Sequence, residues 1–132
     1  MDNHFEKVES YLNELGILIE EKNEEKTLFV VNDENRGIHN LIIDCEDELL
    51  VLEQVIFQVN SSNADTFSRL LQMNRELIHG AFALDEAGKT VLFRDTLQLQ
   101  NLDLNELEAS INALALGLAD FADELIGFSK QD

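Results

Sequence analysis

Residues 38–59 read IHNLIIDC-EDE-LLVLEQVIFQV, two apolar runs separated by an acidic turn at positions 46–48. The second run has the length of a short helix. Its β-branched and aromatic residues, and the two-residue spacing of Val55, Phe57 and Val59, favour a strand instead. Two strands joined by a short polar turn predict an antiparallel hairpin.

The residues before this hairpin predict one more strand and a helix. The β-branched run TLFVV at 27–31 precedes the turn-rich stretch 32–37, so we expect a three-stranded antiparallel meander. An amphipathic helix over residues 5–15 comes first, and Gly16 stands where a helix ends in the left-handed conformation. Its apolar positions follow the spacing of three and four typical of a helix: Phe5, Val8, Leu12 and Leu15.

The residues after the hairpin predict a second helix, over residues 64–78. Ser61, Ser62 and Asn63 precede it and have side chains that cap a first helical turn. Asn74 falls within the apolar stripe of this helix, and a buried amide requires partners, either at an interface or in nearby backbone groups. The apolar residues of the stripe are Phe67, Leu70, Leu71 and Ile78.

A second hairpin and a long final helix complete the chain. Residues 80–85 (GAFALD) and 89–99 (KTVLFRDTLQL) flank a turn that contains Gly88. Asp103 and Glu106 then have the spacing of a capping box. An uninterrupted apolar stripe follows: Leu107, Ile111, Leu114, Leu118, Phe121, Leu125 and Phe128.

This stripe has two interpretations, the core face of a helix lying on a sheet or a dimer seam. Its alanine-rich flanks and Gly117 favour the core, because a coiled coil needs sustained heptads with charged flanks. We therefore expect residues 1–132 to form a single α+β domain. It has an antiparallel sheet and helices in the order α-β-β-β-α-β-β-α.

Charge and composition exclude several classes of function. Asp and Glu number 27 against 9 Lys and Arg, a formal charge of −18, which disfavours binding to nucleic acid or an anionic membrane. The charge itself is explained by solubility, by a basic client or by mimicry of nucleic acid. A single cysteine, no apolar run long enough for a membrane span and no signal-like N-terminus predict a cytoplasmic protein.

No catalytic, metal or cofactor motif stands out, so we expect a binding protein and not an enzyme. His4, His39 and His79 do not have the spacing of metal ligands. Cys45 lies beside Asp44 and other carboxylates, which disfavour the thiolate that a nucleophile requires. An enzyme with an unrecognised site would show a deep pocket with convergent polar groups.

Several short motifs resemble the type III secretion chaperone superfamily, which includes the Tir-chaperone (CesT-like) and YbjN-like proteins. The resemblance covers residues 64–128 and is carried by a leucine pair and asparagine, an "LD…G" turn and an aspartate-led final helix. These are Leu70-Leu71-Gln-Met-Asn74, Gly80-Ala-Phe82-Ala-Leu84-Asp85 with Gly88, Val91-Leu-Phe93-Arg94, and Leu102-Asp103-x-x-Glu106-Leu107.

The resemblance implies a small acidic cytoplasmic homodimer without enzymatic activity. The secretion chaperones hold an extended segment of an effector against apolar patches, whereas the YbjN-like proteins are thought to be regulatory. Two hypotheses follow, a chaperone-like or adaptor dimer that holds a segment of a partner protein, and a regulator that acts through transient protein partners. Candidate dimer or partner contacts lie on the middle and final helices: Leu71, Asn74, Leu114, Leu118, Phe121 and Leu125.

Overall fold

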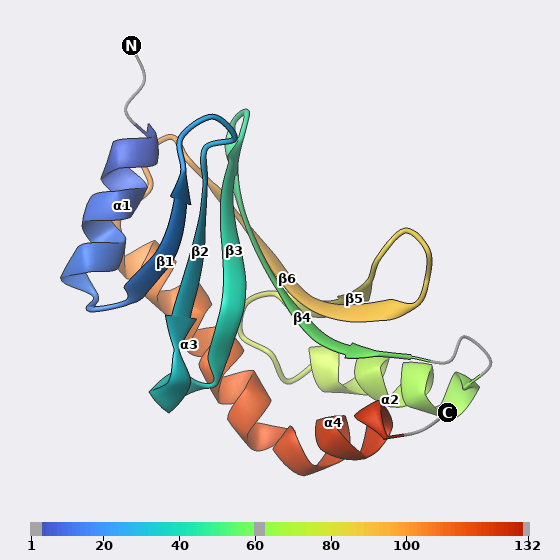
Figure 1. Cartoon of the computed structure of the whole chain (residues 1–132). Helices are drawn as coiled ribbons and strands as arrows, with labels where there is room; N and C mark the ends of the chain where they lie inside the picture. Colours follow the sequence, from blue (N-terminus) through green and yellow to red (C-terminus); the bar gives the residue numbers. More distant parts are fainter. Residues whose placement is uncertain (1–3, 60–62, 131–132) are drawn as a thin grey trace.

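A computed structural model describes residues 4–59 and 63–130 of the chain. It confirms the α+β class and the predicted order of elements, with one more strand near the N-terminus and a break in the final helix (Figure 1). The elements are α1 (His4–Glu14), β1 (Leu18–Asn23), β2 (Leu28–Asp33), the 3₁₀ helix η1 (Glu34–Arg36), β3 (Ile38–Glu46), β4 (Leu49–Gln58), α2 (Ala64–Asn74), β5 (Ala81–Leu84), β6 (Thr90–Gln98), α3 (Leu104–Asp120) and α4 (Ala122–Ser129).

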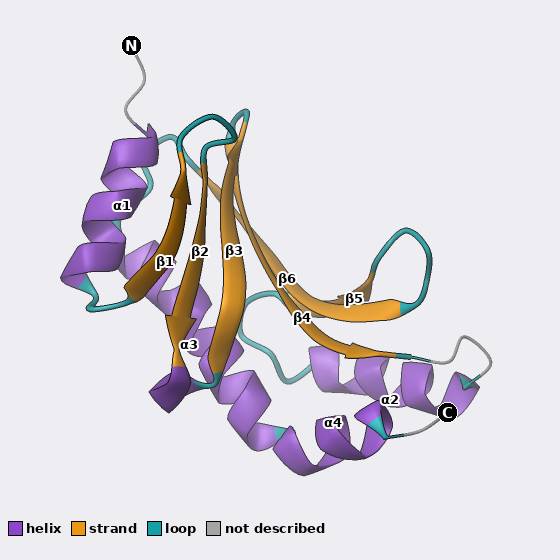
Figure 2. Ribbon diagram, viewed as in Figure 1, coloured by secondary structure: helices purple, strands orange, loops and turns teal. Residues whose placement is uncertain are grey.

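The strands form one antiparallel sheet in the order β1-β2-β3-β4-β6-β5. The first four strands are a meander, and β6 then pairs with β4 along almost its whole length, which places the short strand β5 at the far edge. Figure 2 shows the sheet bending along β4 and β6, so that β5 and α2 lie away from β1 and α1. The two edges of the sheet are therefore β1 and β5.

One face of the sheet carries the core and two of the helices. The register aligns five residues in a single row across this face: Lys22, Phe29, Ile43, Leu52 and Asp95. Phe5 of α1 stacks on Phe29 with 4.4 Å between ring centroids. Ser110 of α3 donates a hydrogen bond to the Asp95 carboxylate at 2.7 Å. Both helices therefore cover the same face.

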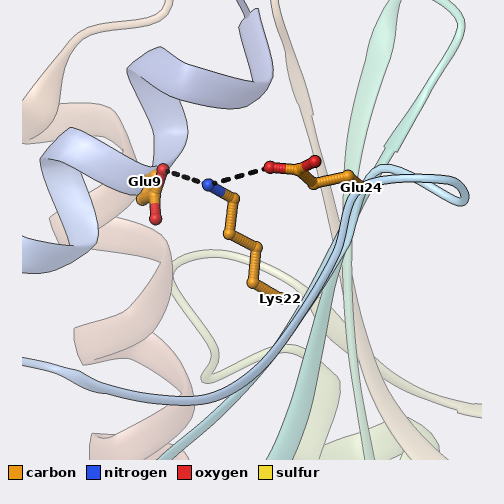
Figure 3. Close-up of polar contacts among 3 residues, drawn as sticks. All are labelled: Glu9, Lys22 and Glu24. Carbon is orange, nitrogen blue, oxygen red and sulfur yellow. Dashed lines mark hydrogen bonds and ion pairs between the residues drawn. The ribbon is translucent and has the colours of Figure 1, made fainter.

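Strand β1 was not predicted from the sequence. Its residues, LIEEKN, are mostly polar and exposed, so they lack the alternation by which a strand is recognised. Pairing with β2 and a contact with α1 hold it instead. Lys22 Nζ lies 3.0 Å from Glu9 of α1, and 3.3 Å from the nearby Glu24 (Figure 3). The hydrogen bond that Lys22 donates to the Glu9 carboxylate is the main cause that raises the pKa of Lys22.

The opposite face mixes apolar and charged side chains. The next row in register consists of Glu21, Val30, Ile42, Glu53 and Arg94. Arg94 Nη1 donates to Glu53 at 3.2 Å, and Ile42 is among the exposed large apolar residues of the chain. This face is therefore only partly apolar.

The middle helix is shorter than the sequence predicts. It begins as expected, since the Asn63 side chain accepts a hydrogen bond from Thr66 N at 3.2 Å, whereas the predicted capping residues Ser61 and Ser62 lie outside the described residues. The prediction that it extends to Ile78 is wrong, because α2 ends at Asn74. Beyond it, Leu77 packs against Gly117 of α3, where a Cβ on the glycine would lie 2.8 Å from the leucine side chain.

The final helix is divided in two. The capping box at its start is confirmed, with reciprocal bonds between Asp103 and Glu106. The stripe predicted one continuous helix, but the backbone leaves helical geometry at Phe121 (φ −111°, ψ 14°) and α4 starts anew. Because of this break, Phe128 of α4 lies beside Phe57 of β4, with 6.0 Å between their rings. Among the described residues, no helix is both long and apolar enough to cross a membrane.

Candidate functional site

The six candidate interface residues separate by burial into core and surface. Leu114 and Leu125 are buried in the monomer, at 1% and 5% exposed. The structure thus places these two in the core, the interpretation that the flanks of the stripe favoured. Leu118 and Phe121 pack against the core but are only partly buried. Leu71, expected on the apolar face of α2, is 69% exposed.

A groove runs along α3 and α4, which face η1, β3 and β4 across it. It consists of two adjoining hollows of about 550 and 340 Å³ that share Gly37 and Leu118. Leu116, Val55 and Ile126 line it and are each more than half exposed. We call this feature the helix groove. Several exposed apolar side chains on one surface mark a contact site more often than isolated ones do.

A buried glutamine shapes the floor of the helix groove. Gln54 of β4 is 4% exposed. Its side-chain oxygen accepts from His39 N at 3.0 Å, and its amide donates to Gly37 O at 3.3 Å. These bonds fix the junction of η1 and β3, where Gly37 is left-handed with φ 73°. The groove floor is thus fixed by bonds from a side chain to the backbone of a distant segment, which a sequence pattern does not reveal.

An ion pair holds α4 in place beside α2. Arg69 donates two hydrogen bonds to the Glu124 carboxylate, from Nε at 2.7 Å and from Nη2 at 3.2 Å. Its guanidinium also lies 5.7 Å from the centre of the Phe121 ring, at the break between α3 and α4. The bond from Arg69 lowers the pKa of Glu124. Phe121 and Glu124, at the break and in the first turn of α4, are therefore both in contact with Arg69 of α2.

A second apolar hollow of about 360 Å³ lies between α2 and the edge strand β5. We call it the edge pocket. Its lining is almost wholly apolar and includes Leu71 and Leu84, both exposed. Phe67, Leu70, Phe82 and Val91 also line it. The edge pocket is the surface of α2 that is open to another molecule.

Asn74 lies beside the edge pocket and is bonded to β5. Its side-chain oxygen accepts from Phe82 N at 2.7 Å, and its amide donates to Phe82 O at 3.2 Å. Of the two interpretations of this residue, the structure supports the capping of nearby backbone groups. The asparagine of the leucine-pair motif thus joins α2 to β5.

A third hollow, of about 820 Å³, is polar and lies over β1, β2 and η1. Four carboxylates line it and no lysine or arginine does. They belong to Glu20, Glu21, Asp33 and Glu34. This part of the surface favours cationic groups, as does the net charge of the chain.

Within residues 4–59 and 63–130, no three His, Cys, Asp or Glu side chains gather closely enough to hold a metal ion. Burial raises the pKa of Asp44, and the neighbouring Glu46 and Glu53 raise it further. Asp44 lines neither the helix groove, nor the edge pocket, nor the polar hollow, so this shift does not mark an acid–base site in any of them.

Comparison with known proteins agrees with this fold. The sequence matches the CesT_Tir_1 family model over residues 1–131. No curated protein matches the sequence. The structure is similar to that of YbjN from E. coli, a proposed transcription regulator, with a TM-score of 0.69 and 12% identity over 91% of this chain and 92% of that chain.

Two chaperone structures are also similar. One is the HopA1-SchA chaperone–effector complex, with a TM-score of 0.61 and 14% identity over 99% of both chains. The other is the Yersinia pestis type III secretion chaperone SycH in complex with a fragment of YscM2, with a TM-score of 0.55 and 18% identity over 96% of this chain and 100% of that chain. At these identities the likeness shows the fold, and the match of the family model shows the family. The chain belongs to the CesT_Tir_1 family and has the fold of the type III secretion chaperones.

Proposed function

We propose that this protein is a chaperone-like or adaptor protein that holds a segment of a partner protein and acts by binding, not by catalysis. The observation that carries the proposal is the helix groove, in which Leu116, Val55 and Ile126 are each more than half exposed. Burying exposed apolar surface is the main favourable contribution to most protein association. A monomer gains nothing from keeping three such side chains in one groove.

The shape of the helix groove favours an extended segment over a folded domain. The two hollows follow one another along α3 and α4 and meet at Leu118, so a chain lying along them fills both. Similar structures include a secretion chaperone in complex with a fragment of another protein. Binding of an extended segment by this chain requires no chemistry beyond apolar contact and main-chain hydrogen bonds.

We further propose that the protein is a homodimer and that the edge pocket carries the dimer contact. Leu71 is 69% exposed and stands at the rim of a pocket lined by apolar side chains. In a two-fold dimer the same patch serves both copies, so an apolar protrusion beside an apolar hollow is self-complementary. The helix groove then stays free for the partner segment.

The acidic charge limits the kind of partner. A formal charge of −18 repels nucleic acid and anionic lipid at the distances where encounter begins, so a protein is the favoured partner. A cytoplasmic location fits the single cysteine of the sequence, Cys45, because one thiol cannot form an internal disulfide.

A regulator is the second candidate, and a specific likeness favours it. The structure resembles YbjN with a TM-score of 0.69, and YbjN is a proposed transcription regulator. Regulation through a transient protein partner uses the same groove with weaker binding. The two candidates therefore differ in the lifetime and stoichiometry of the complex.

Two matched substitutions test the proposal, Leu116→Asp in the helix groove and Leu71→Asp at the edge pocket. Both positions are more than half exposed, so neither change buries a charge. Tagged wild type and variants are purified from the native cells, and the bound proteins are identified by mass spectrometry. The mass of each pure protein is measured by light scattering.

We expect Leu116→Asp to lose a stoichiometric partner and stay dimeric, and Leu71→Asp to become monomeric and keep the partner. A partner seen only after cross-linking favours the regulator. A wild type that is monomeric and carries no partner under either condition contradicts the proposal.

A further inference from the structure

We propose that the Asn74 side chain closes the β5 edge of the sheet against pairing with a second copy of this chain. The edge of a sheet presents unpaired N–H and C=O groups that form a template for another strand. In this protein the two edges are β1 and β5. Each has to be protected if the protein is not to extend its sheet by self-association.

The direction of the bonds at β5 shows which groups face the open edge. In an antiparallel strand the N–H and C=O of one residue point to the same side, and the sides alternate along the chain. Asp85 N donates to Thr90 O at 3.0 Å, toward β6. By alternation, Phe82 and Leu84 direct their backbone groups away from β6. These are the groups that an added strand uses.

Asn74 occupies one of these two positions completely. Its carboxamide accepts from Phe82 N at 2.7 Å and donates to Phe82 O at 3.2 Å. A primary amide presents the same donor and acceptor as a peptide unit, so it takes the place of a residue in a neighbouring strand. On a strand of four residues, this leaves only the Leu84 groups for a partner.

The surroundings of β5 explain why its edge needs this protection. Its sequence, AFAL, contains no charge that would repel a second copy. The edge pocket lies beside it and gives the side chains of an added strand an apolar site. The other edge differs, because β1 carries Glu20 and Glu21 and an irregular register between Ile19 and Glu21. Charges and bulges are common means of blocking edge pairing.

The inference does not depend on the proposed function. If the protein is a dimer through the edge pocket, loss of Asn74 adds larger species to the dimer. If it is a monomer, loss of Asn74 produces the first associated species. The readout is therefore the change from the wild type at equal concentration, whatever state the wild type has.

The test is Asn74→Ala, with Gln72→Ala as the matched control. Gln72 is an exposed amide on the same helix, so Gln72→Ala removes an amide side chain from α2 without removing a bond to β5. Amide hydrogen exchange is followed residue by residue, and association is followed by sedimentation velocity over a range of concentrations. In Asn74→Ala we expect the Phe82 amide to exchange about tenfold faster or more, because two hydrogen bonds are lost. We also expect a concentration-dependent increase in mass, and neither change in Gln72→Ala.

A second variant and a wild-type measurement keep the test decisive if Asn74→Ala does not fold. Asn74→Asp keeps an acceptor for Phe82 N but offers no donor to Phe82 O, so it should associate less than the alanine variant and more than the wild type. In the wild type itself, the Phe82 amide should exchange more slowly than the Leu84 amide. Equal exchange of these two amides, or an alanine variant with unchanged mass and unchanged exchange at Phe82, overturns the proposal.

Discussion

Two leucines of α3, two residues apart, allow the effect of a core substitution on stability to be compared with that of a surface substitution. Leu114 is 1% exposed and lies in the hydrophobic core, whereas Leu116 is 54% exposed and lines the helix groove. Each is replaced by alanine, the best helix former, so helix propensity contributes little to either result. The difference between the variants therefore reports burial.

The magnitude follows from the burial of each side chain. Leucine to alanine removes three carbon atoms, and about 0.8 kcal/mol for each buried methylene gives about 2.4 kcal/mol. The cavity left at Leu114 adds roughly 1 kcal/mol more, because a close-packed core relaxes only in part. We expect Leu114→Ala to lower the free energy of unfolding by about 3 to 4 kcal/mol. Leu116→Ala should change it by less than about 0.5 kcal/mol, as is usual at the surface.

Urea denaturation followed by circular dichroism measures both variants at one protein concentration, since association would alter apparent stability. With a slope of about 2 kcal/mol per molar urea, Leu114→Ala should shift the midpoint by roughly 1.5 to 2 M. A shift below about 0.3 M for Leu114→Ala refutes its place in the core. A larger loss at Leu116 than at Leu114 refutes the assignment of Leu116 to a partner surface.

Three further predictions concern the turns and the charges. Gly88→Ala should lower the free energy of unfolding by about 1 kcal/mol, because the new Cβ is strained at φ 72° although it meets open space. Gly80→Ala should lower it by about 3 kcal/mol or more, because its Cβ would also overlap the phenyl ring of Phe93. Thermal melts of the two variants measure the difference. Asp44→Asn should stabilise the protein at pH 7 by less than about 1 kcal/mol. Because the pKa of Asp44 is raised in the folded state, the wild type loses stability as the pH rises through that pKa. Urea titrations should therefore show the stabilisation by Asp44→Asn vanish below about pH 3.8, where the carboxyl group is protonated in both states. Glu124→Gln should destabilise the protein at pH 7 by weakening the bond from Arg69. Because the pKa of Glu124 is lowered in the folded state, the wild type loses this stabilisation as the pH falls. Thermal melts at several pH values should therefore show the difference between variant and wild type shrink below about pH 4.5.

The candidate site was only partly predictable from the sequence. The stripe on the final helix identified core residues such as Leu114, because burial repeats with the period of the helix. It did not identify Leu116 or Ile126, which are exposed apolar residues outside that stripe. Their exposure depends on where η1, β3 and β4 leave room, and no local pattern records this.

For Asn74, too, the sequence left alternatives open and the structure decided between them. A polar residue in an apolar stripe predicted either an interface contact or a backbone cap. The choice depended on how α2 lies against β5, since the bonds to Phe82 form only when that strand is at hydrogen-bonding distance.

The sequence by itself determined the α+β class, the strands from residue 28 onward, the capping box at Asp103 and the family resemblance. These features depend on local periodicity, turn residues and caps, which act over a few neighbouring positions. Only the tertiary structure decided the strand β1, the end of α2 at Asn74 and the break at Phe121. Each of these depends on contacts between distant segments, such as that of Lys22 with Glu9, Leu77 with Gly117 and Phe121 with Arg69. Such contacts accompany the packing of distant segments, and this packing overrides weak local preference because it contributes more free energy than intrinsic propensity does.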